Sequence, residues 1–242
     1  MLNFKREEDI PASLQKEEIK EFISNYIKYK NDPENIPKPE KPISYRHSDL
    51  LDAFDRSFFS KCYLTEQKFE NSFIMDIEHF VPQNEDGTLI YEWTNLFPAE
   101  HYTNMIKPRK TPTGGYLNPC ADEDDVEKEI VYSLSTHGFK PSFFSANDDN
   151  VKAKNTCELL DRLHNGHDEN TYKATESLRH AIHKKYIDIL KTIIEYRSHP
   201  SGSQEKHQAF RDLRDLLSRK SSFTMLSRSI PAVSLIEENI LD

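Results

Sequence analysis

The sequence contains few glycines, few cysteines and no long apolar segment. Its 242 residues include six glycines and three cysteines. An odd number of scattered cysteines does not form a disulfide framework and fits a reducing compartment. No apolar run approaches the roughly 18 to 20 residues that span a bilayer, and the first residues lack the apolar region of a signal peptide. We therefore expect a cytoplasmic protein without a membrane partner.

Positive charge is also scarce. Lysines and arginines number 32 against 41 aspartates and glutamates, which gives a net charge of −9. Affinity for nucleic acid comes largely from clustered basic side chains, so a protein of this charge would need a partner to hold such a substrate. Basic clusters at 179–185 and 211–220 alternate with other residues along predicted helices, and we interpret them as solvated helix faces. The cluster at 107–110 is either a substrate contact or ordinary surface.

Helical patterns dominate both ends of the chain. Apolar residues repeat every three to four positions after Pro11, after Ser48 and from Asn155 onward, where residues 155–158 resemble a capping box. Four prolines between 33 and 42 indicate an extended connector. We expect an α+β, mostly α fold. Its predicted parts are an N-terminal helical segment with a Pro-rich connector (1–57), a strand-bearing core (58–150) and a C-terminal helical region (151–242).

The core is predicted to contain a small hairpin. Residues 73–80 are aromatic, branched or alternating, and Pro82 prevents continuation, which predicts a short strand ending near His79. Residues 84–87 indicate a turn, and residues 89–93 are the predicted partner strand, which we expect to end at Phe97 and Pro98. A further strand is predicted at 130–134.

A short helix after the hairpin would place His101, Asn104 and Lys107 on one side. Asn104 would then face Glu78, while strand alternation points Glu78 and His79 to opposite faces. Carboxylate and amide oxygens suit Mg²⁺, and a histidine suits removal of a proton from water. The pattern therefore indicates metal-dependent hydrolysis of a phosphodiester.

The order of these residues resembles the HNH endonuclease superfamily, whose core is the ββα-metal motif. The resemblance implies that His79 is the general base, that Glu78 and Asn104 bind Mg²⁺ or Mn²⁺, and that Asn95 braces the hairpin loop. It also implies that Lys107 contacts phosphate. The further substrate-binding candidates are His101, Arg109 and Lys110.

The sequence departs from many HNH proteins at the positions of their structural zinc. Those proteins carry two Cys-x-x-Cys pairs, whereas here Cys62 has Thr65 in place of its mate. Glu100 and Thr103 stand where the second pair would be. We expect no structural zinc, so packing from the rest of the chain must support the motif.

Segments beyond the motif are similar to HNH nucleases of retron and Septu anti-phage systems. The similar segments include 117–122 and 155–166, and the resemblance extends from about residue 58 to at least residue 195. It implies a PtuB-like effector nuclease that acts with a PtuA-like ABC-type ATPase, in some systems beside a retron reverse transcriptase and its RNA–DNA hybrid. The chain has no Gly-x-x-x-x-Gly-Lys loop, so ATP chemistry would belong to the partner.

A rival interpretation is a non-catalytic adaptor that keeps an HNH-like fold as a docking module. Net acidity and the missing cysteines favour the adaptor, and the presence of Glu78, His79, Asn104 and Lys107 favours the nuclease. Additional metal ligands are conceivable elsewhere, but we interpret the acids of 122–125 as a solvated loop and the remaining histidines as packed or exposed. We likewise interpret the aromatic residues of 58–110 as core rather than base-stacking surfaces. The acids considered as metal ligands are Asp122, Asp124 and Asp125, and the histidines are His164, His167, His180 and His183.

Overall fold

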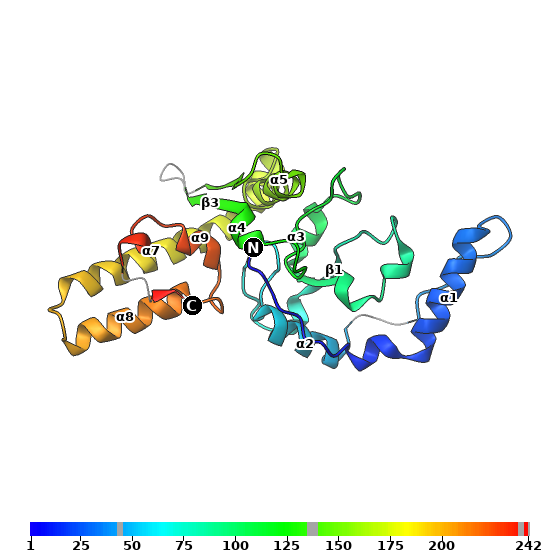
Figure 1. Ribbon diagram of the computed structural model, residues 1–242, viewed down its shortest axis with the longest axis horizontal. Helices are drawn as coiled ribbons and strands as arrows, with labels where there is room; N and C mark the ends of the chain where they lie inside the picture. The colour runs from blue at the N-terminus through cyan, green and yellow to red at the C-terminus, as the bar shows by residue number, and fades with distance from the viewer. Residues whose placement is uncertain (43–45, 135–139, 237–239, 242) are drawn as a thin grey trace. The chain divides into compact units, whose positions relative to one another are not determined.

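The computed structural model describes residues 1–42, 46–134, 140–236 and 240–241. These residues form an α+β fold in which helices predominate and the strands make two small antiparallel sheets (Figure 1). The chain divides into two compact units. The N-terminal unit comprises Phe4–Tyr63 and Phe69–Thr113, and the C-terminal unit comprises Met1–Asn3, Leu64–Lys68 and Gly114–Asp242.

The N-terminal unit begins with two helices and ends with a strand–strand–helix segment. Short 3-10 turns connect its parts. The turn η2 owes its start to Asn71, whose side chain accepts a hydrogen bond from Phe73 N. In chain order the elements are η1 (Ala12–Gln15), α1 (Glu17–Asn31), α2 (Ser48–Phe58), η2 (Ser72–Ile74), β1 (Asp76–His79), η3 (Gly87–Leu89), η4 (Trp93–Asn95), β2 (Leu96–Ala99) and α3 (His101–Ile106).

An aromatic core supports the β1–β2 sheet. Phe54 and Phe58 lie one turn apart on α2 and are completely buried. The Phe54 ring centroid lies 5.1 Å from that of Trp93, and the Phe58 centroid lies 5.7 Å from that of Phe97 on β2. Burial of each such side chain stabilises the fold by about 1.5–3 kcal/mol. The predicted second helix is therefore the support on which the sheet rests.

The first strand of the predicted hairpin is confirmed, and the second is wrong. β1 pairs with β2 at Leu96–Ala99, whereas residues 89–93 lie in and between 3-10 turns. Pro98 was expected to end the strand and instead lies within β2, opposite Ile77. Both strands of a two-stranded sheet are edge strands, so a residue without a backbone N–H is tolerated there.

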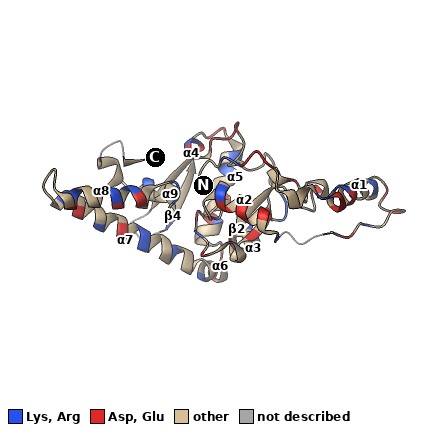
Figure 2. Ribbon diagram, turned by 90° about the horizontal axis from the view of Figure 1, so that it is seen from below, with Lys and Arg blue, Asp and Glu red and all other residues tan. Residues whose placement is uncertain are grey.

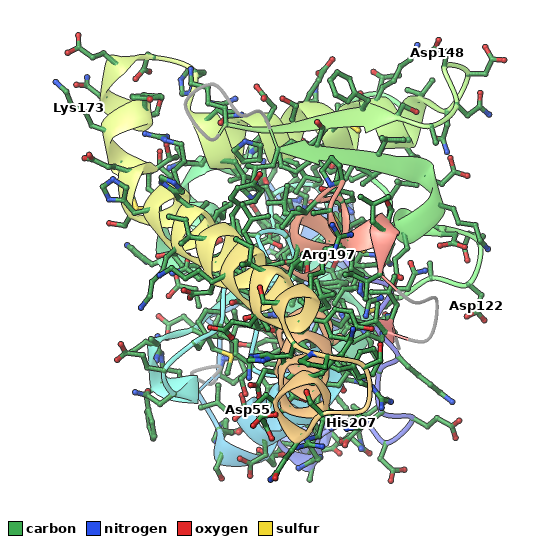
Figure 3. The ribbon with its side chains drawn as sticks, turned by 90° about the vertical axis from the view of Figure 1, so that its left-hand side faces the viewer. Asp55, Asp122, Asp148, Lys173, Arg197 and His207 are labelled. Atoms are coloured by element: carbon green, nitrogen blue, oxygen red, sulfur yellow. The ribbon has the colours of Figure 1, made fainter. Side chains whose placement is uncertain are left out.

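The C-terminal unit packs a helix against a β-hairpin. β3 pairs with β4 from Ile130 opposite Ser145 to Leu134 opposite Pro141, and α5 lies along this hairpin (Figure 3). The predicted strand at 130–134 is confirmed, and the turn expected at Gly138 lies outside the described residues. In chain order the elements are α4 (Val126–Glu129), β3 (Ile130–Leu134), β4 (Pro141–Ser145), α5 (Val151–Asn165), α6 (Glu169–Ala174), α7 (Glu176–Ser198), α8 (Gln204–Leu217), α9 (Thr224–Arg228) and η5 (Val233–Leu235).

The start of α5 differs from its prediction, and its end agrees. The helix is capped by Asn150, whose side chain accepts a hydrogen bond from Ala153 N at 3.0 Å. Asn155, the predicted cap, lies inside the helix and donates to Gly115 O at 2.8 Å. The helix ends at Asn165 because Gly166 adopts a positive φ of 69°.

α7 and α8 lie side by side and close a second apolar core (Figure 1). Basic and acidic residues are interspersed along both helices, with no continuous basic stripe in the view of Figure 2. None of the helices in the described part of the chain is long and apolar enough to cross a membrane. The core comprises Ile189, Ile193, Leu213, Leu217, Ile230, Val233 and Ile240.

Candidate functional site

The candidate site is built from β1, the loop that follows it, and α3. β1 presents Asp76 and Glu78 on one face, because side chains alternate along a strand. α3 lies against β1, and its first turn is capped by Glu100, whose side chain accepts from Thr103 N at 3.1 Å. This cap fixes where the helix begins and therefore which helix residues meet the strand.

Asp76 collects two side chains from α3. Its Oδ2 atom lies 2.8 Å from His101 Nδ1 and accepts a hydrogen bond from Asn104 Nδ2 at 3.1 Å. Arg46 Nη2 lies 3.8 Å from the other carboxylate oxygen of Asp76. His101 is largely exposed, whereas Asp76 is partly buried. A carboxylate, an amide and an imidazole therefore meet at a position that solvent can reach.

Sequence reasoning missed Asp76 and expected Asn104 to face Glu78. The structure pairs Asn104 with Asp76 instead, two residues earlier on the same face of β1. The alternation of side chains along the strand could have identified Asp76. It places Asp76 on the same face as Glu78, so either residue is a possible partner for α3. Lys107 directly follows the last residue of α3 and is three residues after Asn104, so when Lys107 meets Glu78, Asn104 meets Asp76.

Glu78 forms a buried ion pair with Lys107. Lys107 Nζ lies 2.5 Å from Glu78 Oε1 and also donates to His79 O at 2.8 Å and to Phe80 O at 2.9 Å. The Tyr63 hydroxyl donates to the second carboxylate oxygen at 2.7 Å. Burial raises the pKa of Glu78, and the ammonium of Lys107 opposes that shift. Both residues expected to touch a metal or phosphate are thus engaged with each other.

His79 is held in one tautomer by the loop after β1. Its Nε2 atom lies 3.0 Å from Ile90 O, and because a carbonyl only accepts, we assign the ring proton to Nε2. Nδ1 then carries a lone pair, and the side-chain nitrogen of Gln83 lies 3.0 Å from Nδ1 and 3.3 Å from Nε2. Burial lowers the pKa of His79 to about 4. At neutral pH the ring is therefore uncharged and able to accept a proton at Nδ1.

Asn95 ties together the loop that carries Ile90. Its side-chain oxygen accepts from Val81 N at 2.7 Å, and its amide donates to Val81 O at 3.2 Å and to Leu89 O at 3.1 Å. Asn95 is only 5% exposed, so these bonds replace water that the loop groups have lost. The side chain fixes the carbonyl of the neighbouring Ile90, which orients His79.

The remaining predicted substrate residues lie beyond α3. Arg109 and Lys110 are exposed. The segment is tied to the loop after β1 because Thr111 Oγ1 donates to Glu85 Oε2 at 2.7 Å. The predicted residues therefore do not meet at a single point: the side chains of Glu78, His79 and Asn104 each have a separate set of partners.

Two of the acids considered as extra metal ligands have structural partners. Asp124 forms an ion pair with Lys152 at 3.0 Å, and Asp125 accepts from Asn3 at 2.7 Å. Cys62 is a free, fully buried thiol. No group of three or more histidines, cysteines, aspartates or glutamates in the described residues is placed to hold a metal ion. Asp76 and His101 supply two such residues, and Asn104 adds a side-chain amide whose nitrogen faces Asp76.

Comparison with known proteins gives one limited similarity. No family model matches the chain, and no solved structure matches it. A stretch of 92 residues is 24% identical to part of Autophagy-related protein 2 from Neosartorya fischeri, which covers 38% of this chain and 4% of that protein. The matched stretch is a small fraction of the larger protein, so the similarity carries no argument about the activity of this chain.

Proposed function

We propose that this protein is a metal-dependent, HNH-type nuclease that hydrolyses phosphodiester bonds. The observation that carries the proposal is the pairing of two arrangements on one strand. Asp76 meets Asn104 and His101 at one end of β1, and His79 at the other end has a neutral ring with its lone pair on Nδ1. A divalent-ion site and a proton acceptor are the two parts that such hydrolysis requires.

The donor set fits a hard divalent cation. The carboxylate of Asp76 is a ligand that Mg²⁺ accepts while keeping several waters, Asn104 would offer its amide oxygen once the amide, whose nitrogen now donates to Asp76, has turned, and the imidazole of His101 also suits Mn²⁺. A bound ion would stabilise negative charge on the scissile phosphate. His79 would accept a proton from the attacking water once the Gln83 amide leaves Nδ1. Glu78 and Lys107 would hold β1 against α3 rather than bind the ion.

The proposed setting is a bacterial anti-phage system of the retron or Septu type. A net charge of −9 gives the chain little electrostatic attraction for nucleic acid. We therefore propose that a PtuA-like ABC-type ATPase binds the nucleic acid and regulates its cleavage. A retron reverse transcriptase with its RNA–DNA hybrid is a further proposed partner.

A non-catalytic adaptor is the second candidate function. The buried Glu78–Lys107 pair favours it, because the carboxylate is already satisfied without a metal ion. The amide of Gln83 on His79 is also compatible with a resting scaffold. The two candidates differ in a single observable, which is metal-dependent cleavage.

The test is a nuclease panel with plasmid, single-stranded DNA and RNA, using the protein with its ATPase partner in Mg²⁺, Mn²⁺ or EDTA. His79→Ala should lower the cleavage rate by about 10²- to 10⁴-fold, the usual contribution of a positioned base. The matched control is His180→Ala, which removes an exposed histidine of α7 and should leave the rate unchanged. Cleavage by His79→Ala at the wild-type rate would contradict the assigned role, and no cleavage of any substrate would favour the adaptor.

The same panel separates the two possible ligand pairs. Asp76→Asn should raise the Mg²⁺ concentration needed for half-maximal cleavage, because a ligand charge is lost. Glu78→Gln should leave that concentration close to the wild-type value, since Glu78 bonds to Lys107 and Tyr63. The reverse result would return the metal-binding role to Glu78.

A further inference from the structure

An exposed aromatic side chain lies directly before the strand that carries the candidate site. Phe73 is 74% exposed, although it is followed two residues later by Met75, which is 1% exposed. Neighbouring Ile74 is 51% exposed, and Met105 on α3 is 70% exposed. Single exposed apolar residues are ordinary on protein surfaces, so the position and support of Phe73 decide whether it has a role.

The backbone around Phe73 is held rigidly. The side chain of Asn71 accepts a hydrogen bond from Phe73 N at 3.0 Å, which caps the short turn η2. The guanidinium of Arg46 donates to Phe73 O and, at 3.3 Å, to Met75 O. Burial of Met75 anchors the chain two residues after Phe73. An exposed ring on a fixed backbone loses little conformational entropy when a ligand packs against it.

The same guanidinium connects Phe73 to the candidate metal site. Arg46 contacts the backbone oxygen of Phe73 and lies 3.8 Å from Asp76 Oδ1. One guanidinium therefore contacts both the backbone oxygen of Phe73 and the carboxylate that meets His101 and Asn104. Phe73 also lies only three residues before Asp76 in the sequence.

We propose that Phe73 is a stacking platform for an unpaired nucleobase next to the scissile phosphate, so that the site takes single-stranded or looped nucleic acid rather than intact duplex. The proposal rests on the nuclease function proposed above and adds its substrate class. Stacking on an aromatic ring needs a base that has left its own stack, and it does not depend on net charge. It therefore suits a chain whose charge of −9 gives weak attraction to phosphate.

Binding is measured on the full chain, alone and together with its ATPase partner, in EDTA so that no cleavage interferes. Fluorescence anisotropy is recorded with a labelled single strand and with the duplex of the same sequence. Wild-type protein should bind the single strand more tightly, and Phe73→Ala should weaken that binding by about 5- to 100-fold. Phe73→Trp should keep the affinity. The matched control is Ile194→Ala, which removes an apolar side chain that is 64% exposed on α7 and should change nothing.

Phe73→Trp also gives a direct signal of stacking. The chain's single tryptophan, Trp93, is 3% exposed, so a new indole at position 73 reports on its own surroundings. Its emission should be quenched by the single strand and not by the duplex.

Equal affinity of wild type and Phe73→Ala for single strands overturns the platform, as does equal binding of duplex, or failure of the wild type to bind any strand. A Phe73→Ala protein that binds strands normally but no longer associates with the ATPase would assign the ring to a protein partner instead. The outcomes also separate the two proposals. If Phe73 contributes to strand binding but no metal ion supports cleavage, the platform proposal stands and the nuclease proposal fails. If the protein cleaves and Phe73→Ala cleaves equally well, the nuclease proposal stands and the platform proposal fails.

Discussion

Each unit of the protein buries a histidine, and the surroundings of the two rings differ. His79 is 8% exposed and His164 is 2% exposed. Burial lowers the pKa of each to about 4. Exposure and pKa therefore do not distinguish the two residues, and only their hydrogen-bond partners do.

His164 makes contacts typical of a structural residue. Its Nδ1 atom lies 2.7 Å from Leu160 O, one turn earlier in the same helix, and its ring centroid lies 4.8 Å from that of Phe143. The buried cation nearby, Arg179, donates to His164 O at 3.3 Å and to Tyr172 O at 2.7 Å. These cation contacts satisfy backbone oxygens around α5 and α6.

In both rings a backbone carbonyl faces one nitrogen, which therefore carries the proton, and His79 differs in that the Gln83 side-chain amide lies 3.0 Å from its other, basic nitrogen. The Gln83 amide at Nδ1 can rotate away without breaking secondary structure, whereas the Ile90 carbonyl at Nε2 is fixed by the loop. The buried cation nearby, Lys107, is paired with a carboxylate. The comparison teaches that a buried histidine indicates a candidate site when its basic atom faces a replaceable group and acidic side chains gather on the same element.

The largest effect expected from this comparison is at Lys107. Lys107→Ala leaves Glu78 buried without its cation, so the free energy of unfolding should fall by about 3–5 kcal/mol. Lys152→Ala is the matched change in the C-terminal unit, where the lysine side chain is 41% exposed beside buried Asp124. It should cost about 1 kcal/mol or less. Urea unfolding of both variants gives the two values.

A second substitution sharpens that result. Glu78→Gln in the Lys107→Met background removes both charges, so it should recover part of the stability that Lys107→Met alone loses. Equal losses in the Lys107 and Lys152 variants would show that the Glu78–Lys107 pair is not buried as the structure has it.

The next largest effect is the pH dependence that the two histidines share. Each folded-state pKa of about 4 lies below the ordinary value of 6.5, so the unfolded chain takes up the proton first as the pH falls. Stability is therefore complete above pH 6.5 and is lost progressively as the pH drops toward 4. Each ring should remove about 2 kcal/mol between pH 7 and pH 5.

His79→Gln and His164→Gln keep a hydrogen-bond donor and do not titrate. Each should reduce the difference in unfolding free energy between pH 7 and pH 5, as measured by urea unfolding at both pH values. A wild-type protein equally stable at both would mean that neither ring is buried in the neutral form.

Local chemistry predicts the elements of the candidate site better than their pairing. Alternation before Pro82 located β1, and apolar spacing after Ser48 located α2, because both patterns depend on near neighbours. The partner strand was misplaced because its pairing with β1 depends on how the intervening loop folds. That loop uses two 3-10 turns, and the predicted strand at 89–93 covers the end of the first turn, the residues between the turns and the start of the second.

The same distinction applies to the side chains of the site. His79 and Asn104 were singled out from sequence, but the choice between Asp76 and Glu78 as the partner of Asn104 depends on the register of α3 against β1. A capped helix start at Glu100 sets that register. Gln83 was missed because its contact with His79 arises from the path of the loop after Pro82, which no periodicity describes.

The smallest expected effect is at two asparagines, Asn95 in one unit and Asn150 in the other, whose side chains form hydrogen bonds with the backbone. Asn95→Ala leaves Val81 and Leu89 without their side-chain partner, which should cost about 1–3 kcal/mol because these groups are buried. Asn150→Ala removes the cap of α5 and a hydrogen bond to the Glu129 side chain, which should cost about 1 kcal/mol. Asn95→Asp discriminates further, since a carboxylate has the same shape but cannot donate to the carbonyls of Val81 and Leu89. It should be at least as damaging as Asn95→Ala in urea unfolding and should also lower cleavage by disturbing the Ile90 carbonyl that orients His79. An Asn95→Asp protein with normal stability would mean that the loop is held by other contacts and that the orientation of His79 does not depend on Asn95.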